Sequence, residues 1–279
     1  MRYMITDDLW ATLGPAVRQA KRYTCGRPPA LPDRMFLEAL LYWARTGIPW
    51  RDLPDVFGAW DAVYNRFRRW VGSGSLTALF EVLTADPAFG EVRRVLLDST
   101  VIRAHAHAAG APRKGKRIGA ARSAAAQGLG RSRGGYTTKV VLTAADEATA
   151  VAVEVIPGQA NDAPRLEPML RRTAARVPGI DELTGDTGFD GDAQREACLA
   201  RGIFPNIPNR KTRVDPWPFD PDGYKERNRV ERLVGKLKQF RRAATRYEKL
   251  KRTFLGVLHL ALGFIRLKRL MRTSIVNTA

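Results

Sequence analysis

The first third of the chain carries apolar residues at helical spacing. PDRMFLEALLYWARTG predicts a helix that ends on Gly47, a good helix terminator, with an apolar side formed by Phe36, Leu37, Leu40, Leu41 and Trp43. WRDLPDVFG predicts a short helix that Gly58 stops. AWDAVYNRFRRWVG predicts another helix, with an apolar face formed by Trp60, Val63, Tyr64, Phe67, Trp70 and Val71. Residues 1–88 are therefore predicted to form a small all-α domain.

The opposite face of this last helix is basic and polar. It presents Asn65, Arg66, Arg68 and Arg69. A short helix, a glycine turn and a second helix with such a face are the outline of a helix-turn-helix. On that interpretation Arg66, Arg68 and Arg69 contact DNA. A plain helical bundle with a solvated face fits the same pattern.

From residue 89 onward the pattern becomes α/β. VRRVLLDST predicts a buried strand that ends in a polar cluster, and GYTTKVVLTAADEATAVAVEVIPG predicts two strands joined at Asp146-Glu147. DELTGD and IFPNIP predict further strands, and helices are expected over residues 162–176, 191–202, 224–240 and 253–271. The order predicts a mixed five-stranded sheet with flanking helices, within a second domain over residues 89–279.

Residues 104–135 interrupt this pattern. They are rich in Ala, Gly and Arg and contain no acidic residue, so they cannot bury enough apolar surface to fold alone. A basic flexible loop could settle on phosphates through side chains that include Arg131 and Arg133. A flexible linker is the alternative.

The net charge of the chain indicates which kind of partner it binds. The net charge is +19 and the pI near 10.6, and residues 1–90, 91–180 and 181–279 contribute +2, +8 and +9. Nucleic acid is the commonest polyanion that attracts such a chain, although a ribosomal protein could be equally basic. Two cysteines, no signal peptide and a longest apolar stretch of only residues 254–264 favour a cytoplasmic protein with no membrane span.

Three carboxylates stand where a catalytic site is expected. Asp98 and Asp186 each follow a short apolar strand, and Glu231 lies on a later helix. Strand ends form the natural crevice of an open α/β sheet, so the three side chains can converge there. Converging carboxylates repel one another unless cations neutralise them, and hard oxygen ligands suit two Mg²⁺ or Mn²⁺ ions. Such a pair of ions supports phosphoryl transfer.

The helix over residues 224–240 has two distinct faces. Helical geometry places Tyr224, Arg227, Glu231 and Lys238 within an arc of roughly 60°. The apolar stripe beside them comprises Val230, Leu233, Val234, Leu237 and Phe240. A solvated face with Arg227 and Glu231 as an i,i+4 ion pair is the alternative interpretation.

The spacing Tyr224-x2-Arg227-x3-Glu231-x6-Lys238 resembles the Y-R-E-K signature of bacterial insertion-sequence transposases of the family 4 and family 5 group. GRPPALPDRMFLEALLYWARTGIPWRDLP, VYNRFRRW, LLDSTVIRAHAHAAG, GRSRGGYTTK, GDTGFDG and LKQFRRAATRYEKL resemble further blocks of family 5. The resemblance implies an RNase H-like catalytic domain and a DDE active site. It implies that Asp98, Asp186 and Glu231 bind two Mg²⁺ ions, and that Tyr224, Arg227 and Lys238 contact DNA phosphates near the element end.

An active DNA transposase is thus the leading hypothesis. It would cleave the terminal inverted repeats of its element and join the 3′-hydroxyls to target DNA, as at least a homodimer on paired ends. A catalytically silent, domesticated transposase that only binds DNA is the alternative, and a junction resolvase is a third. His105 and His107 are expected to support the loop or touch DNA, and Asp190 and Asp192 to cap a helix.

Overall fold

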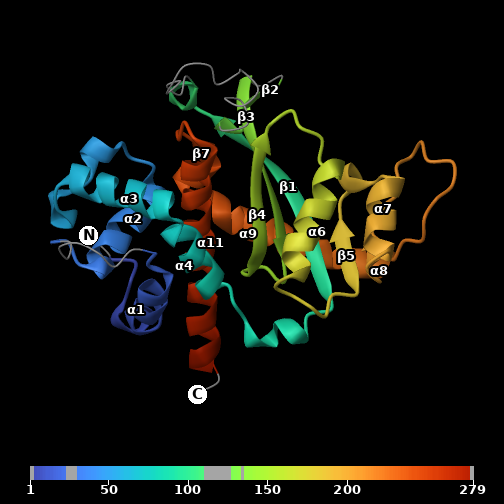
Figure 1. Ribbon diagram of the computed structural model, residues 1–279, viewed down its shortest axis with the longest axis horizontal. Coiled ribbons are helices and arrows are strands. Elements are labelled where there is room, and N and C mark those ends of the chain that lie inside the picture. The colour runs from blue at the N-terminus through green and yellow to red at the C-terminus, as the bar shows by residue number, and fades with distance from the viewer. Residues whose placement is uncertain (1–2, 23–29, 110–126, 133–134, 277–279) are drawn as a thin grey trace. The chain divides into compact units, whose positions relative to one another are not determined.

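The computed structural model describes residues 3–22, 30–109, 127–132 and 135–276 (Figure 1). Contacts within the chain divide it into two compact units. Unit 1 comprises residues 1–84, 105–111 and 236–279, and unit 2 comprises residues 85–104 and 112–235. The predicted domains were residues 1–88 and residues 89–279. The contacts group residues 236–276 with the N-terminal helices, whereas the prediction assigned them to the same domain as the sheet.

Unit 1 is helical. Its elements are α1 (Asp7–Ala20), α2 (Asp33–Thr46), the 3₁₀ turns η1 (Trp50–Asp52) and η2 (Asp55–Phe57), α3 (Trp60–Ser73), α4 (Ser75–Leu83), η4 (Ala106–Ala108), α10 (Arg241–Ala244), β7 (Thr245–Arg246) and α11 (Lys251–Val276). Helix α2 ends at Gly47, which has φ +78°, as predicted. The short helix expected before Gly58 is instead two 3₁₀ turns, each beginning after a proline that fixes the local backbone.

Helix α11 packs against α4 and α1 in the core of unit 1. Its glycines permit this approach, because a Cβ on Gly256 would lie 3.0 Å from Val71 Cγ2 and 3.1 Å from Leu76 Cδ1. The His259 ring stacks on Phe80 with 4.6 Å between centroids. The apolar C-terminal stretch is therefore core of unit 1. No helix among the described residues is both long and apolar enough to cross a membrane.

Unit 2 is built on a mixed sheet. Its elements are η3 (Pro87–Gly90), β1 (Arg94–Ala104), β2 (Gly130–Ser132), β3 (Gly135–Ala144), β4 (Ala150–Pro157), η5 (Ala163–Arg165), α6 (Leu166–Ala174), β5 (Glu182–Gly185), η6 (Thr187–Phe189), α7 (Asp192–Leu199), β6 (Phe204–Asn206), α8 (Pro221–Tyr224), η7 (Lys225–Arg227) and the start of α9 (Asn228–Lys238). The five main strands follow the order β4-β3-β1-β5-β6. Strands β1, β3 and β4 are antiparallel, and β5 and β6 run parallel to β1. This order agrees with the predicted RNase H-like fold.

The core of unit 2 lies between the sheet and its helices. Val95, Leu97, Val141 and Leu183 from the strands pack with Met169 from α6 in one cluster. Cys198 belongs to this cluster, and burial raises the pKa of its thiol to about 12, so it is a core residue.

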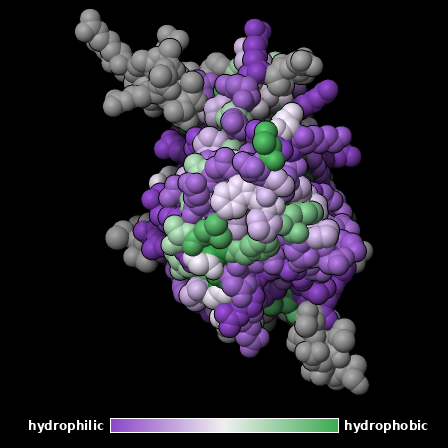
Figure 2. Space-filling model, turned by 90° about the vertical axis from the view of Figure 1, so that its right-hand side faces the viewer, coloured by the Kyte–Doolittle hydropathy of each residue, from purple (hydrophilic) through white to green (hydrophobic). Residues whose placement is uncertain are grey.

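The face shown in Figure 2 is mainly hydrophilic with small hydrophobic patches.

Strand β2 adds order to the segment predicted as a loop. Gly130 and Arg131 pair with Thr137 and Tyr136 of β3, on the edge that β4 continues. The Arg131 guanidinium lies 5.2 Å from the Tyr136 ring centroid and is exposed. Arg133 and residues 110–126, including most of the predicted basic loop, lie outside the described residues. Arg131 is thus held at a sheet edge.

Candidate active site

Strand pairing brings the two aspartates together. Strands β1 and β5 are parallel, with Leu96 opposite Thr184 and Leu97 opposite Gly185. The next residues along the two strands are Asp98 and Asp186, so they leave neighbouring strands at the same level. Asp98 does not end its strand as expected, because β1 continues to Ala104 along β3. It marks the point where the partner β5 ends.

The two aspartates have different surroundings. Asp98 is 6% exposed, and its burial raises the pKa of its carboxyl above the usual 3.8. Arg227 opposes this shift, and the negative charges of Asp186 and Glu231 add to it. Asp186 caps η6, and its Oδ1 accepts a hydrogen bond of 2.8 Å from the Gly188 amide. One carboxylate is buried in the sheet and the other is fixed by a turn.

The segment α8–η7–α9 carries the remaining candidates. The predicted apolar stripe is confirmed, because Val230, Leu233 and Leu237 are fully buried and Val234 and Phe240 nearly so. The predicted single helix is interrupted by a 3₁₀ turn over Lys225–Arg227. Glu231 stands on the other face of α9, with a side chain that is 53% exposed. Burial of one face thereby turns the polar residues toward the aspartates.

Arg227 lies among all three carboxylates. Its Nη2 is 2.6 Å from Asp98 Oδ1 and 3.8 Å from Asp186 Oδ2, and its Nη1 donates to Glu231 Oε1. Burial lowers the Arg227 pKa, but the facing carboxylates outweigh this and the net shift is upward. Three acidic groups from β1, the end of β5 and α9 therefore face one cationic group.

The donor set suits a hard divalent cation. Carboxylate oxygens are the ligands that Mg²⁺ and Mn²⁺ prefer, and these three already face a positive charge. Among the described residues, no three acidic, histidine or cysteine side chains are grouped closely enough to hold a metal ion as they stand. The carboxylates converge on the Arg227 guanidinium, so metal binding there requires that side chain to move.

Tyr224 borders the same site. Its ring packs edge-on against Phe219, with 5.3 Å between centroids, and its side chain is half-buried. Burial raises the pKa of its phenol, and Arg227 opposes this while the three carboxylates add to it. Tyr224 thus remains a neutral hydrogen-bonding group near the carboxylates at neutral pH. Lys238 is the last residue of α9 and is exposed.

Sequence reasoning missed two residues beside Asp186. Lys139 Nζ lies 2.8 Å from Asp162 Oδ1, and both side chains are largely buried. A Cβ on Gly188 would meet Asp186 Oδ1 at 2.8 Å and Asp162 Oδ2 at 3.4 Å, so both aspartates border this glycine. The PGQAND turn directly after a strand was the available signal. Asp162 adds a fourth carboxylate near the site, neutralised by its own lysine.

Asp190 does not belong to the site and does not cap the N-terminus of α7. It is 2% exposed, and its Oδ1 accepts from Arg195 Nε and Arg213 Nη2, each at 2.9 Å. Its Oδ2 accepts from the Arg210 amide. Asp192 is the first residue of α7, and Gly191 holds the N-cap position. Asp190 instead anchors the loop between β6 and α8.

The predicted contacts outside this site divide into buried and exposed residues. Arg66 is 3% exposed, donates to the Leu31 carbonyl and pairs with Asp33, so its assignment as a DNA contact is corrected to a structural one. Arg68 and Arg69 are exposed on α3. His105 stacks on Tyr247 and accepts from the His107 amide, which supports its turn.

The chain matches two transposase family profiles. A family profile described as "Transposase DDE domain" matches residues 91–263, and one described as "Putative transposase of IS4/5 family" matches residues 5–80. An uncharacterized protein of Sinorhizobium fredii, y4sN, is 39% identical over 115 residues, which cover 41% of this chain and 88% of that protein. A Brucella ovis protein, "Putative transposase for insertion sequence element IS6501", is 31% identical over 118 residues, covering 42% and 87%.

Two solved structures of Mos1 assemblies are also similar in part. The Mos1 strand transfer complex matches with a TM-score of 0.30 and 14% identity over 81% of this chain and 68% of that chain. The pre-cleavage Mos1 transpososome matches with a TM-score of 0.27 and 13% identity over 88% and 80%.

Proposed function

Because this chain belongs to the DDE transposase family, we propose that Asp98, Asp186 and Glu231 form its catalytic centre and bind two Mg²⁺ ions. The protein is a DNA transposase, a metal-dependent enzyme that cleaves and joins DNA. One observation carries the assignment of residues: side chains of β1, of the end of β5 and of α9 converge on the Arg227 guanidinium.

In this proposal the three carboxylates hold the cations from differently fixed positions. Asp98 is fixed within the sheet and Asp186 by its turn, so these two provide a rigid platform. Glu231 is more exposed and reaches the platform from the helix. Bound divalent ions supply activation of the attacking oxygen and stabilisation of the leaving oxygen. Asp98 must lose its proton to serve as a ligand, so its raised pKa makes acid oppose cation binding.

The substrate proposed is double-stranded DNA. Water attacks a phosphodiester at the terminal inverted repeats and releases a 3′-hydroxyl, which then attacks a phosphodiester of target DNA and releases another 3′-hydroxyl. Tyr224, Arg227 and Lys238 bind the phosphates next to the reacting bond, and Arg131 binds DNA farther away. Arg133 is assigned to DNA on the sequence alone. Since two ends must be joined to one target, a homodimer on paired ends is the proposed assembly.

Arg227 has two roles in this proposal. It holds the three carboxylates before cations bind, and it then turns to a phosphate of the DNA. Arg227→Gln is expected to bind Mn²⁺ about tenfold more tightly without DNA, since it removes a competing positive charge within a few ångströms. Titration of the protein followed by electron paramagnetic resonance of free Mn²⁺ measures this affinity.

Arg229→Gln is the matched control for Arg227. Arg229 also pairs with two acids, Glu147 and Glu226, and lies two residues farther along. Its substitution should leave Mn²⁺ affinity unchanged. Equal or weaker Mn²⁺ binding by Arg227→Gln would contradict the competition.

The function is tested with a plasmid that carries the gene between its native flanks. Purified protein is incubated with it in Mg²⁺, in Ca²⁺ and in EDTA, and the cut positions are mapped. We expect Mg²⁺-dependent cuts at the flank boundaries and strand transfer to a second plasmid. DNA binding without any cut would instead indicate a silent transposase, and preferential cutting of four-way junctions would indicate a resolvase.

A further inference from the structure

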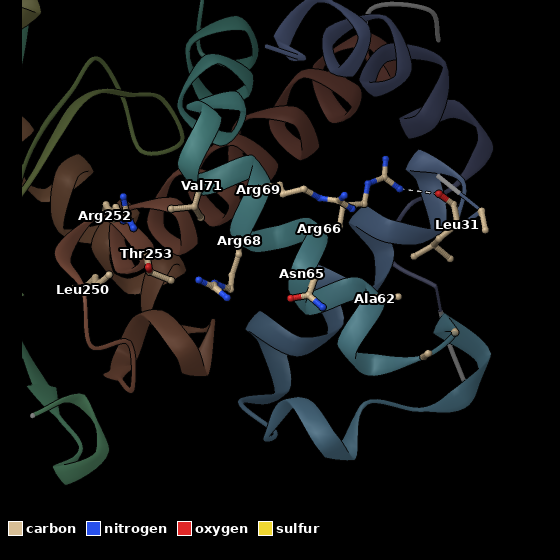
Figure 3. Close-up of a pocket in the computed structure, with 13 residues that line it drawn as sticks. Leu31, Ala62, Asn65, Arg66, Arg68, Arg69, Val71, Leu250, Arg252 and Thr253 are labelled. Carbon is tan, nitrogen blue, oxygen red and sulfur yellow. Dashed lines mark hydrogen bonds between the residues drawn. The ribbon is translucent and has the colours of Figure 1, made fainter. Parts of the chain in front are cut away.

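A cavity of about 1010 Å³ opens in unit 1 beside helix α3 (Figure 3). Its walls are α3, the segment before α2, the turn at Gly58 and the first turn of α11. Asn65, Arg66, Arg68, Arg69 and Arg252 line it, and none of the described residues that line it is acidic. Figure 3 shows Asn65 and Arg68 projecting from α3, and Arg252 and Thr253 from α11. The concave surface is therefore strongly positive.

Three of the four arginines that line this cavity are available for a ligand. Asn65, Arg68 and Arg69 follow i, i+3, i+4 spacing, so they share one face of α3, and all three are exposed. Arg252 is also exposed. In the part of the chain that the structure describes, none of Arg68, Arg69 and Arg252 forms an ion pair with an acid. Three uncompensated guanidinium groups around one cavity favour an anion.

Arg66 makes the wall of the cavity rigid. Its guanidinium lies under α3, where it donates to the Leu31 carbonyl and pairs with Asp33, as the dashed line to Leu31 shows in part (Figure 3). It also lies 4.2 Å from the Phe36 ring centroid. This buried arginine ties α3 to α2 and to the segment before it. The exposed arginines therefore stand on a fixed surface.

The first turn of α11 adds positive charge at an unusual place. A helix N-terminus is already electropositive, and acids are the residues that usually stabilise it. Helix α11 has 26 residues, no acid in its first turn, and the exposed Arg252 there instead. A cation at this end is repelled by the positive end of the helix dipole, and a bound anion would offset that repulsion. The start of α11 is thus a second, independent feature that favours an anion at this cavity.

We propose that this cavity binds the phosphate backbone of duplex DNA, jointly through α3 and the first turn of α11. Guanidinium groups bind phosphates with paired hydrogen bonds, and several arginines around an open cavity suit consecutive phosphates of a strand. The proposal rests on the DNA transposase function and adds to it a surface that includes Arg252, near the C-terminal end of the chain. Contacts to phosphates carry no sequence information, so this surface holds DNA without selecting it.

The test measures how affinity depends on salt. Wild-type protein and the variants Arg68→Gln, Arg69→Gln and Arg252→Gln are titrated into labelled duplexes between 50 and about 300 mM salt. Each phosphate contact contributes about 0.9 to the slope of log K against log salt. We expect each variant to lose about 0.9 of slope and about eightfold in affinity at 0.1 M salt, equally for element-end and unrelated duplexes.

Arg18→Gln is the matched control, because Arg18 is an exposed arginine on α1 that does not line the cavity. It should keep the wild-type slope. Unfolding midpoints of all variants should stay near wild type, since the substituted side chains are exposed. A wild-type slope for Arg68→Gln and Arg252→Gln would overturn the proposal.

Two other results would also overturn it. A loss confined to element-end DNA would assign base contacts to this surface, and equal binding of duplex RNA with equal slopes would remove the assignment to DNA.

The outcome of this test is separable from the outcome of the test of the proposed function. Mg²⁺-dependent cutting at the element ends by wild type tests the function, whereas the salt slopes of the arginine variants test the cavity.

Discussion

Glu231→Ala is expected to reduce Mg²⁺-dependent cleavage of element ends by at least about 1,000-fold. A ligand that helps to place a catalytic cation contributes several kcal/mol to the transition state, and about 4 kcal/mol corresponds to this factor. Folding should be almost unaffected, because the side chain is 53% exposed and its i,i+4 pair with Arg227 is worth a few tenths of a kcal/mol. Single-turnover cleavage of a labelled end duplex measures the loss.

Glu226→Ala is the matched control for Glu231. Glu226 lies five residues earlier, is 46% exposed and pairs with Arg229 at i,i+3. Among the described residues, no hydrogen bond or ion pair joins Glu226 to Asp98 or Asp186. We expect its cleavage rate to stay within about threefold of wild type, a change below 1 kcal/mol. Comparable losses in the two variants would remove Glu231 from the catalytic centre.

Asp190→Ala is expected to destabilise the protein by about 3–5 kcal/mol. Asp190 and Arg195 form an ion pair in which both side chains are fully buried, and loss of one partner leaves an uncompensated charge in the core. The loop between β6 and α8 would also lose its anchor, because Arg210 and Arg213 donate to the same carboxylate. Thermal unfolding should show a midpoint about 10 °C lower.

Asp192→Ala controls for the loss of a carboxylate near that loop. Asp192 also accepts from Arg213, but it is 62% exposed, so its removal should lower the unfolding midpoint much less than Asp190→Ala does. Similar midpoints for the two variants would contradict the prediction.

The stabilisation by Asp190 should also depend on pH in a defined direction. Burial alone would raise the pKa of its carboxyl, but donation from Arg213, the Arg210 amide and Arg195 outweighs burial and lowers it below 3.8. The stabilisation is therefore complete above pH 4 and is lost only as the pH falls through the lower folded pKa. The difference in stability between wild type and Asp190→Ala should shrink only under such acid conditions.

Local patterns were enough to predict much of the sheet and the helix that carries the site. The apolar runs predicted three strands that the structure places over residues 94–104, 135–144 and 150–157, although the first was predicted only over residues 92–100. Four of the five predicted apolar residues lie on the buried face of α9, and the fifth, Phe240, is buried just beyond its end. These features depend on periodicity, which a single segment displays. Asp98 and Asp186 were predicted to converge because both follow apolar runs, and β1 extends six residues beyond Asp98.

Features that depend on distant partners were not predictable. Arg66 and Arg195 look like exposed helix residues in the sequence, yet both are buried because Asp33 and Asp190 meet them in the folded chain. The packing of α11 with α1 and α4 joins segments more than 160 residues apart. The pair of Lys139 with Asp162 likewise joins a strand to a later turn. No local period encodes such contacts.

The pairing of β1 with both of its neighbours has a genetic consequence. Asp98 faces Leu142 of β3 and lies one residue beyond the pair of Leu97 with Gly185. An insertion of one codon between positions 94 and 98 would preserve the reading frame, yet it would turn Asp98 to the opposite side of the sheet, since side chains alternate. Such an allele should yield full-length protein and an element that moves only when an intact copy supplies transposase in trans. A mating-out assay measures the mobility of this element with and without the intact copy. Normal mobility without the intact copy would contradict the prediction and would show that the strand can shift its register.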